Sequence, residues 1–347
     1  MIRRFVAYCL LVLTGCTVFL SCTQTTQRNN FVDETRLLMG TVVRIVVYDQ
    51  NKPESEIKNA VRSAFGKMAK IELQCSAVIE SSEISQINQN AGIKAVTVSG
   101  DVAQILQTAA SVSEISEGAF DISVLPVLSL WNFNSHNKKF RKPDSLEILE
   151  KLPFIDYKKI EQNGVQVKLP EKGMAIDIGG IAKGFAIDAA YDTLLHLGIS
   201  DFMIDAGGDL RLHSGKVSRG KRRVWIKHPR KPGFLWGYFR QDDGCVATSG
   251  DYERFFMVDS VRYHHILDPK TGYPARGCLS VTTMASSAMR ADALATAIFV
   301  LGPEKGLALA ESLPDVEAVV LIEENSKLKS IASSGFKERI FEEVKEY

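Results

Sequence analysis

The chain has 347 residues, with 42 lysines and arginines against 41 aspartates and glutamates, and a formal net charge of +1. Hydrophobic residues make up 45% and charged residues 24%, which are the proportions of a folded globular protein and not of a disordered one. The balanced charge argues against nucleic acid as the main partner, and six cysteines are too few to build a fold from disulfides. The length allows about two domains, or one large one.

The first 22 residues are typical of a secretory signal. The basic start Met1–Arg4 is followed by an almost entirely apolar run, Phe5–Leu20, which is short for a membrane-spanning helix. A cysteine after small residues at such a boundary is what lipoprotein processing requires. We prefer Cys22 as the lipidated residue, because it uses the whole apolar run and leaves a polar tether over 23–36. Cys16 follows a sequence nearer to the standard lipobox and is the fallback. An ordinary cleaved signal is the alternative, and either signal places the mature protein outside the cytoplasmic membrane.

Periodicity and turn residues predict an α+β fold over 37–347, without an internal repeat, a long linker or a regular βαβ pattern. In chain order, we expect a strand at 41–48, helices from 54 to about 71 and over 102–112, a surface loop at 138–143, a hairpin of 164–169 with 175–178, a helix over 182–197, strands at 202–204, 224–226, 237–239 and 279–284, a helix over 289–300, and a hairpin of 318–322 with 328–331. Gly198 and Gly302 are expected to end the third and fourth helices.

Five segments concentrate the residues from which a site could be built. The first is Leu38–Thr41, where a glycine at the entrance of a strand permits close approach of backbone or ligand. Taken alone, this segment is better explained by an ordinary turn. The second is Gly118–Pro126, followed by Leu130–Phe133, which combines a turn, an acid, a hydroxyl and aromatic residues. Aromatic side chains could enclose a flat ring, and core packing beside a capping aspartate is the alternative.

The third segment is Ala175–Asp188, in which a predicted strand ends in an acid, two glycines turn the chain and a helix begins. Helix N-termini bind phosphate through free N–H groups and the helix dipole, and Lys183 could add positive charge. The segment is neither a P-loop nor a G-x-G-x-x-G fingerprint. It fits a dinucleotide site of another design, with a plain glycine turn as the alternative.

The fourth segment comprises Val246–Arg254 and Tyr263–Pro274, where two histidines are adjacent, His264 and His265, beside Asp268. On a strand, neighbouring side chains face opposite sides, so one histidine is expected in the core and one on the other face. A histidine–aspartate pair can transfer protons near neutral pH. A purely structural histidine is the alternative.

The fifth segment is Met289–Thr296, on a predicted helix of small residues. Asp292 and Thr296 are four residues apart, so both oxygens point to one face. A carboxylate and a hydroxyl suit Mg²⁺, which prefers oxygen ligands and keeps waters and phosphates as others. The alternative is that Asp292 caps the helix or faces solvent while Thr296 packs.

Taken together, the segments resemble the FAD:protein FMN transferases, the ApbE-like flavin-trafficking lipoproteins. The likeness runs from about Leu37 to Gly302 and is carried by Met39-Gly40-Thr41, Phe120-Asp121, Asp177–Gly184, Ala247–Asp251, His265–Pro269, and Asp292 with Thr296. It implies a T-fold-related α+β fold, with mixed sheets and packed helices in a single compact unit of two intertwined subdomains. It also implies an Mg²⁺-dependent enzyme, lipid-anchored on the periplasmic side of the cytoplasmic membrane.

The resemblance further implies that FMN moves from FAD to a Thr or Ser hydroxyl of an acceptor protein, with release of AMP. Acceptors of this family are typically subunits of membrane redox pumps. The implied metal ligands are Asp292, Thr296 and the carbonyl of Gly180, and the implied base is His265, with Asp268 as its catalytic neighbour and a swap with His264 left open. The implied FAD contacts are Met39, Ala119, Phe120, Asp121, Asp177, Lys183 and Ile266.

In the implied reaction, Mg²⁺ bridges the FAD diphosphate and neutralises the charge that builds on the leaving AMP. His265 takes the proton of the incoming hydroxyl as that hydroxyl attacks the FMN-side phosphorus. If water enters instead, the same site is an FAD pyrophosphatase. A lipoprotein that only binds and delivers a flavin is an alternative of another class, and it would need neither the metal pair nor the base.

Overall fold

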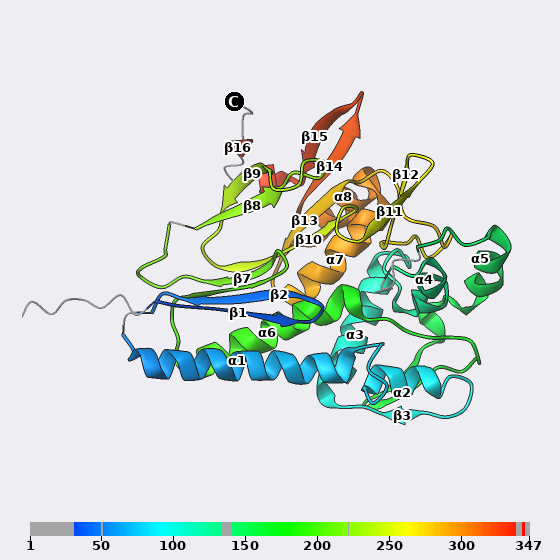
Figure 1. Ribbon diagram of the computed structural model, residues 1–347, viewed down its shortest axis with the longest axis horizontal. Helices are drawn as coiled ribbons and strands as arrows, with labels where there is room; N and C mark the ends of the chain where they lie inside the picture. Colours follow the sequence, from blue (N-terminus) through cyan, green and yellow to red (C-terminus); the bar gives the residue numbers. More distant parts are fainter. Residues whose placement is uncertain (1–30, 50, 134–139, 221, 338–341, 344–347) are drawn as a thin grey trace, which may run out of the picture.

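A long antiparallel sheet runs through the molecule in the computed structural model, with helices packed against one face (Figure 1). The structure describes residues 31–49, 51–133, 140–220, 222–337 and 342–343, so Cys16 and Cys22 lie outside the described residues. In spatial order, the sheet consists of β1 (Val32–Leu38), β2 (Thr41–Val47), β6 (Phe202–Ala206), β7 (Asp209–His213), β10 (Gly244–Gly250), β13 (Ser280–Ala285), β14 (Glu317–Glu324) and β15 (Lys327–Ala332).

Three smaller sheets and a set of helices complete the described part of the chain. The small sheets are β3 (Val96–Thr97) with β5 (Gln166–Lys168) and β4 (Glu161–Asn163), β16 (Glu342–Glu343) with β9 (Leu235–Arg240) and β8 (Arg223–Lys227), and β11 (Phe255–Val258) with β12 (Val261–His264). The helices are α1 (Glu54–Cys75), α2 (Glu83–Gln89), α3 (Gly100–Ile115), α4 (Leu125–Trp131), α5 (Ser145–Lys151), α6 (Gly179–His196), α7 (Ala288–Leu301), α8 (Pro303–Ser312) and α9 (Ser334–Lys337), with short 3₁₀ turns η1 (Ile122–Val124), η2 (Leu152–Phe154) and η3 (Tyr157–Lys159). Among the described residues, no helix combines the length and the apolar character needed to cross a bilayer.

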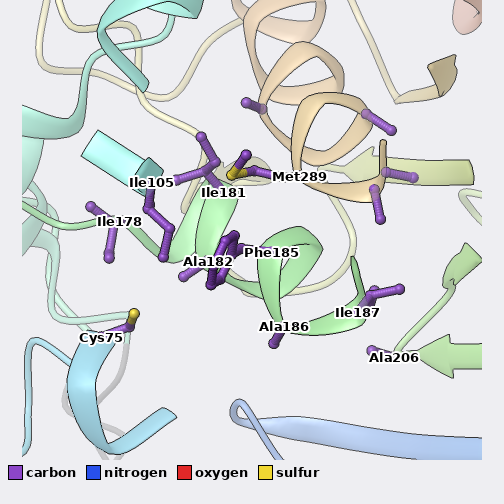
Figure 2. Packing of buried hydrophobic residues seen from close by; sticks show 14 of the residues in the cluster. Cys75, Ile105, Ile178, Ile181, Ala182, Phe185, Ala186, Ile187, Ala206 and Met289 are labelled. Carbon is purple, nitrogen blue, oxygen red and sulfur yellow. The ribbon is translucent and has the colours of Figure 1, made fainter. Parts of the chain in front are cut away.

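Helix α6 occupies the centre of the core. Figure 2 shows Ile181 and Phe185 of this helix between Ile105 of α3, Met289 of α7 and Cys75 of α1. Because α6 is apolar on most of its circumference, it can be stable only when other elements cover it on several sides. The helix therefore has neighbours on several faces, while its first residue, Gly179, is exposed.

Small residues let α6 and α7 pack closely. A Cβ atom added at Gly184 of α6 would lie 2.6 Å from the Cα of Met289 and would also collide with the backbone of Ala288. On α7, four buried alanines alternate through the same region, Ala291, Ala293, Ala295 and Ala297. The close approach of the two backbones places polar groups of α6 and α7 within contact distance.

The α+β class is confirmed, as are most of the predicted elements. Helix α7 ends at Gly302, and Gly198 follows the end of α6 with a positive φ of 73°. The helix predicted over 182–197 begins three residues earlier, because the two glycines already form its first turn. Residues 138–139 of the predicted surface loop lie outside the described residues.

Two predictions about strands are corrected. Residues 175–178 do not pair with 164–169, since β5 pairs with β4 and β3 instead. The extended segment is held by other contacts: the Ile176 N–H donates to Asn88 Oδ1 at 2.7 Å, and the Asp177 N–H donates to the carbonyl of Ile122 at 2.8 Å. In addition, β1 begins at Val32, inside the predicted tether, because it pairs along its whole length with β2.

The contact between α6 and α7 predicts the effect of a single methyl group. Gly184→Ala should lower the free energy of unfolding by about 1–3 kcal/mol, because the helices must move apart. Gly66→Ala in α1 is the matched control, since no atom lies within 4 Å of the added Cβ, and it should keep or raise stability by up to about 1 kcal/mol. Denaturant unfolding checks both; equal stability of the two variants would contradict the packing described.

Candidate active site

The site is built around the start of α6, where Asp177 precedes two glycines. The Gly179 N–H donates to Asp177 Oδ1 at 2.8 Å, and a Cβ at Gly179 would lie 2.9 Å from the same oxygen. The N–H groups of Ile181 and Ala182 donate to the carbonyl of Ile178 at 3.1 and 2.9 Å. The expected row of free N–H groups is therefore largely used within the chain, and positive charge for a phosphate must come from side chains or a cation.

Four of the five predicted segments meet at Gly180. A Cβ at this position would lie 3.3 Å from Phe120 Cε2 and 3.5 Å from Thr296 Oγ1. The hydroxyl of Thr296 is in turn 3.2 Å from the hydroxyl of Ser249 on β10. Gly180 therefore lies between an aromatic ring and the hydroxyl of Thr296, and a side chain at this position would crowd both.

One turn further along α6, Lys183 lies among buried carboxylates. Its Nζ is 2.6 Å from Oδ2 of Asp209, which is 2% exposed and accepts the Thr248 N–H through Oδ1 at 3.0 Å. Asp292 of α7 is 6% exposed and accepts the Gly184 N–H at 3.0 Å. These three charged side chains come from α6, β7 and α7.

The pKa values of this cluster reflect burial and mutual charge. Burial raises the pKa of Asp292 to about 7, with Lys183 opposing the shift and Asp209 adding to it. Burial alone would lower the pKa of Lys183, but Asp209 and Asp292 raise it above its ordinary value. The cluster thus holds one firmly protonated lysine and, in Asp292, a carboxylate that would gain from a further cation nearby.

Asp188 fixes the start of α7 against α6. Its two oxygens accept the N–H groups of Ala288 and Met289, both at 2.9 Å, and it also forms an ion pair with Arg211 of β7. A carboxylate at a helix N-terminus satisfies free N–H groups and matches the helix dipole. The register of α7, and with it the place of Asp292, follows from this contact.

The structure separates the two adjacent histidines. His264 is buried, its Nε2 lies 3.0 Å from the carbonyl of Ala275, and its ring meets Phe299 edge-on. His265 lies on the opposite side of the chain from His264. Its backbone N–H donates to the carbonyl of Arg254, and its ring Nδ1 has no hydrogen-bond partner among the described residues. Because His264 is part of the core, His265 is the better placed of the two histidines to act as a base.

Both imidazoles are neutral at pH 7. Burial lowers the pKa of His265 to about 3, and the charges of Arg254 and His264 add to the shift. Burial likewise lowers the pKa of His264 to about 4. A neutral imidazole is the form that accepts a proton.

Asp268 has its hydrogen bonds within its own turn. Its carboxylate accepts the Lys270 N–H at 2.9 Å and the Thr271 hydroxyl at 3.3 Å, and its carbonyl accepts the Gly272 N–H at 2.8 Å. No hydrogen bond or ion pair joins it to His265 in the part of the chain that the structure describes. Asp268 shapes the turn after Ile266, which is buried, and a catalytic role for Asp268 stays a prediction.

Asp121 also serves the local backbone. Its Oδ1 accepts the N–H and hydroxyl of Ser123 at 2.8 and 2.6 Å, and its Oδ2 accepts the Tyr157 N–H at 3.0 Å. The neighbouring Ala119 and Phe120 are buried. A cavity of about 820 Å³ opens beside this segment, with Asp121 and Tyr157 in its wall, and Pro269 and Lys270 of the fourth segment close its other side.

Two charged residues of the site, Arg254 and Asp209, have no role in the sequence-based prediction. A Cβ at Gly40 would lie 3.8 Å from Arg254 Nη2. Burial raises the pKa of Asp177 and the charge of Arg254 opposes that shift, whereas for His265 burial lowers the pKa and Arg254 adds to the shift. Arg254 thereby connects the turn at Met39, which has a φ of 54°, with the third and fourth segments. Asp209 follows two glycines after a strand, a pattern that could have identified it.

In the described residues, no group of three or more His, Cys, Asp and Glu side chains is arranged to hold a metal. The predicted ligand set is of another kind, with one carboxylate, one hydroxyl and one carbonyl. Gly180 lies next to Thr296, and Asp292 is one helical turn before it. The Gly184 N–H, one turn after Gly180, donates to Asp292 Oδ2 at 3.0 Å.

The buried charges predict a large penalty for removing the shared lysine. Lys183→Met should lower the free energy of unfolding by about 3–5 kcal/mol near pH 8, because two buried carboxylates lose their cation. The loss should shrink as the pH falls, since protonation neutralises them. Lys227→Met is the control, because that lysine forms an exposed pair with Glu253 that contributes about 1 kcal/mol or less. A small, pH-independent loss in Lys183→Met would refute the cluster.

The chain is similar to known proteins over most of its length. Residues 39–320 match the model of the ApbE family. The chain is 33% identical over 324 residues to the FAD:protein FMN transferase of Treponema pallidum, covering 88% of this chain and 87% of that protein, and 31% identical over 303 residues to that of Vibrio cholerae, covering 86% and 90%.

Solved structures agree with the sequence relatives. The ApbE protein of Thermotoga maritima is 34% identical, with a TM-score of 0.80 over 89% of this chain and 98% of that one. The flavin transferase ApbE of Vibrio cholerae is 28% identical, with a TM-score of 0.81 over 89% and 99%. Family model, relatives and structures all cover the segments that form the site, and the chain belongs to the ApbE family.

Proposed function

We propose that this protein transfers FMN from FAD to a Ser or Thr hydroxyl of an acceptor protein and releases AMP. The relatives from Treponema pallidum and Vibrio cholerae are named for FMN transfer from FAD to protein. The observation that carries the proposal is the meeting of Phe120, Gly180, Ser249 and Thr296 at the start of α6, one turn from Lys183.

The chain's own residues can bind and orient a dinucleotide there. Gly180 leaves room for a substrate against the backbone, and Phe120 offers an aromatic edge beside it. Lys183 and Arg254 supply positive charge for a diphosphate, which the first turn of α6 does not supply through free N–H groups. Met39, Ala119, Asp121, Asp177 and Ile266 belong to the surrounding segments, and their contacts with FAD remain part of the proposal.

The donor atoms near Gly180 are of the kind that a divalent cation such as Mg²⁺ prefers. Asp292 is a buried carboxylate with a raised pKa, Thr296 is a hydroxyl one turn later, and the carbonyl of Gly180 is the third donor. An all-oxygen set with few protein ligands is what Mg²⁺ accepts when phosphates and water complete its shell. When bound, the cation would offset negative charge on the FAD diphosphate.

His265 is the proposed general base. Its neutral imidazole can take the proton of the attacking hydroxyl, because burial, with the charge of Arg254 adding to it, keeps the imidazole from being protonated beforehand. Asp268 fixes the turn that follows it. Water in place of the protein hydroxyl would give FAD hydrolysis at the same site.

One experiment separates the candidate functions. The protein is incubated with FAD, Mg²⁺ and a candidate acceptor, and mass spectrometry follows both AMP and the acceptor. Transfer gives AMP together with an FMN-labelled Ser or Thr. Free FMN with AMP indicates the pyrophosphatase, and unchanged FAD with bound flavin indicates a carrier.

The metal ligands predict unequal effects of two substitutions. Asp292→Ala should reduce AMP release about 100-fold or more at moderate Mg²⁺, because the only charged ligand of the proposed set is lost. Thr296→Ala should be milder, since water can replace a neutral ligand. AMP release is measured across Mg²⁺ concentrations and in EDTA, with thermal unfolding as the control for folding. Full wild-type activity in EDTA would rule the metal out.

The low pKa of His265 predicts the shape of the pH profile. At saturating Mg²⁺, which would keep Asp292 ionised, the acid limb of kcat/KM for AMP release should lie below pH 5, because the imidazole of His265 is protonated only there. Arg254→Gln removes a positive charge next to His265, raises its pKa and should move the limb to higher pH. Arg262→Gln changes an arginine that is not among the main causes of the low pKa of His265, and it should move the limb much less. If the acid limb stays in place in Arg254→Gln, His265 is excluded as the general base.

We also propose a lipid anchor at Cys22 and a location on the periplasmic side of the cytoplasmic membrane, with a membrane redox-pump subunit as acceptor. The support is the order of a basic start, an apolar run and a cysteine before a polar segment. Palmitate labelling should persist in Cys16→Ala and be lost in Cys22→Ala. The opposite result moves the anchor to Cys16, and labelling that survives in both variants contradicts a lipoprotein.

A further inference from the structure

A long basic run lies outside the site. From Leu210 to Arg240 the sequence contains ten lysines and arginines and no acidic residue, although the whole chain has a net charge of only +1. This run includes the strands β8 and β9, which form a hairpin at the edge of the molecule (Figure 1). We call this hairpin, with the segment 216–220 before it, the basic hairpin.

The outer face of the basic hairpin combines cations with aromatic rings. On β8, Val224 and Ile226 are buried, while Arg223, Trp225 and Lys227 alternate with them on the outside. Trp225 is 43% exposed. Its ring centroid is 4.8 Å from that of Tyr238 on β9, and the guanidinium of Arg223 lies 4.8 Å from the centroid of the same Tyr238 ring.

The end of the hairpin is apolar as well as basic. Phe234 is 64% exposed and Leu235 is 40% exposed, next to the exposed Lys231. Tryptophan, tyrosine and exposed apolar residues favour the boundary between water and lipid, and lysine and arginine favour anionic headgroups. Few folded surfaces expose such residues together without a partner.

Some cations of this region are held in ion pairs, and others are exposed without such a pair within the described part of the chain. Arg222 pairs with the buried Asp201 at 2.8 Å and Arg230 pairs with Asp251 at 2.7 Å, while Lys227 forms an exposed pair with Glu253. The exposed cations that form no ion pair with another described residue are Lys216, Arg219, Arg223 and Arg240. The acidic strand β16 pairs with β9 on the edge away from β8.

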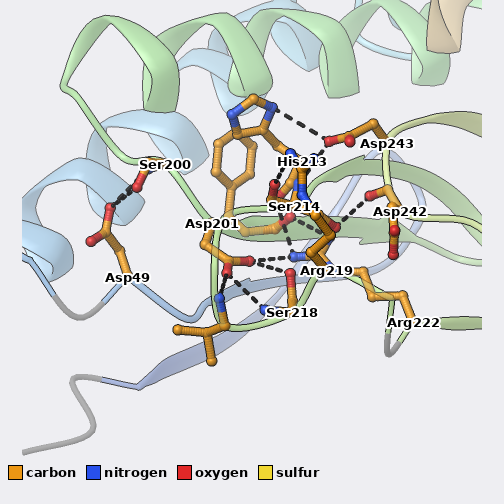
Figure 3. Close-up of polar contacts among 12 residues, drawn as sticks. Asp49, Ser200, Asp201, His213, Ser214, Ser218, Arg219, Arg222, Asp242 and Asp243 are labelled. Carbon is orange, nitrogen blue, oxygen red and sulfur yellow. Dashed lines mark hydrogen bonds and ion pairs between the residues drawn. The ribbon is translucent and has the colours of Figure 1, made fainter.

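The base of the basic hairpin is held firmly. Figure 3 shows Asp201 in contact with Ser218 and Arg222, and the same group includes Ser214, whose N–H donates to Asp243 at 2.7 Å. The N–H of Gly220 donates to Asp242 at 2.7 Å. These contacts fix the direction of the outer face before any partner binds.

The basic hairpin also lies where the N-terminal segment enters the fold. Phe31 is 51% exposed, and its ring centroid is 5.6 Å from that of Tyr48; the guanidinium of Arg222 is 5.3 Å from the centroid of the Tyr48 ring. Only residues 23–30 separate Phe31 from Cys22. Fully extended, such a segment spans at most about 30 Å. A lipid on Cys22 therefore keeps the hairpin close to the membrane.

We infer that the outer face of the basic hairpin docks on an anionic phospholipid surface and orients the enzyme on the membrane. The inference rests on the lipid anchor of the proposed function. Trp225, Tyr238 and Phe234 would enter the headgroup boundary, while the arginines contact phosphate groups. An acidic patch on an acceptor protein is the competing occupant, and the test separates the two.

The test uses the full chain isolated from membranes and reconstituted in vesicles of phosphatidylcholine, with or without phosphatidylglycerol. Brominated lipids quench tryptophan fluorescence on contact, and Trp225→Phe identifies the signal of Trp225. Quenching should be strong in the anionic vesicles, weak in the neutral ones, and reduced at high salt because the attraction is screened. Equal quenching of wild type and Trp225→Phe in anionic vesicles would overturn the inference.

Charge reversal supplies the second arm. Arg223→Glu with Arg240→Glu should weaken the salt-sensitive docking about tenfold or more. Arg62→Glu with Lys70→Glu, two exposed residues of α1 on the opposite side of the molecule, changes the net charge equally and should have no effect (Figure 1). If the hairpin variant keeps normal quenching but loses FMN transfer to its acceptor, the face binds protein and the inference is wrong. Loss of the anchor itself appears separately, as absence of the lipid in mass spectrometry.

Discussion

One lysine shared by two buried carboxylates is the interaction on which the site depends. Lys183 reaches Asp209 from α6, and Asp292 of α7 lies in the same electrostatic environment. Burial of charges is unfavourable unless they are paired, so the three side chains fix the relative positions of α6, β7 and α7. The glycine at 184 permits this arrangement, because any side chain there would separate the two helices.

This constraint also explains the chemistry of the site. The helices around the site are apolar, so its charges are poorly screened by water. Burial therefore raises the pKa of Asp292 to about 7. Arg254 has the corresponding effect on the other side, where it helps to keep His265 neutral. A site with a carboxylate that a cation would stabilise and a neutral imidazole that can accept a proton suits transfer of a group from a diphosphate to a hydroxyl.

Local signals in the sequence predicted the parts of the site but not how they are connected. Glycines and helix-ending residues located α6 and α7, and the spacing of Asp292 and Thr296 placed both on one face. The role of Arg254 could not be predicted, because it depends on a turn more than two hundred residues away at Gly40. Residues 175–178 resembled a strand, but their partners are the side chain of Asn88 and the carbonyl of Ile122, which no periodicity reveals.

The central claim is that FAD binds beside Gly180, where Phe120 and Thr296 meet the start of α6, and calorimetric titration with FAD tests it most directly. Gly180→Val should weaken FAD binding about tenfold or more, because the side chain would fill the space between Phe120 and Thr296. Gly66→Val, on the exposed face of α1, controls for the change of residue, and thermal unfolding confirms that both variants are folded. Unchanged affinity in a folded Gly180→Val variant would contradict this account.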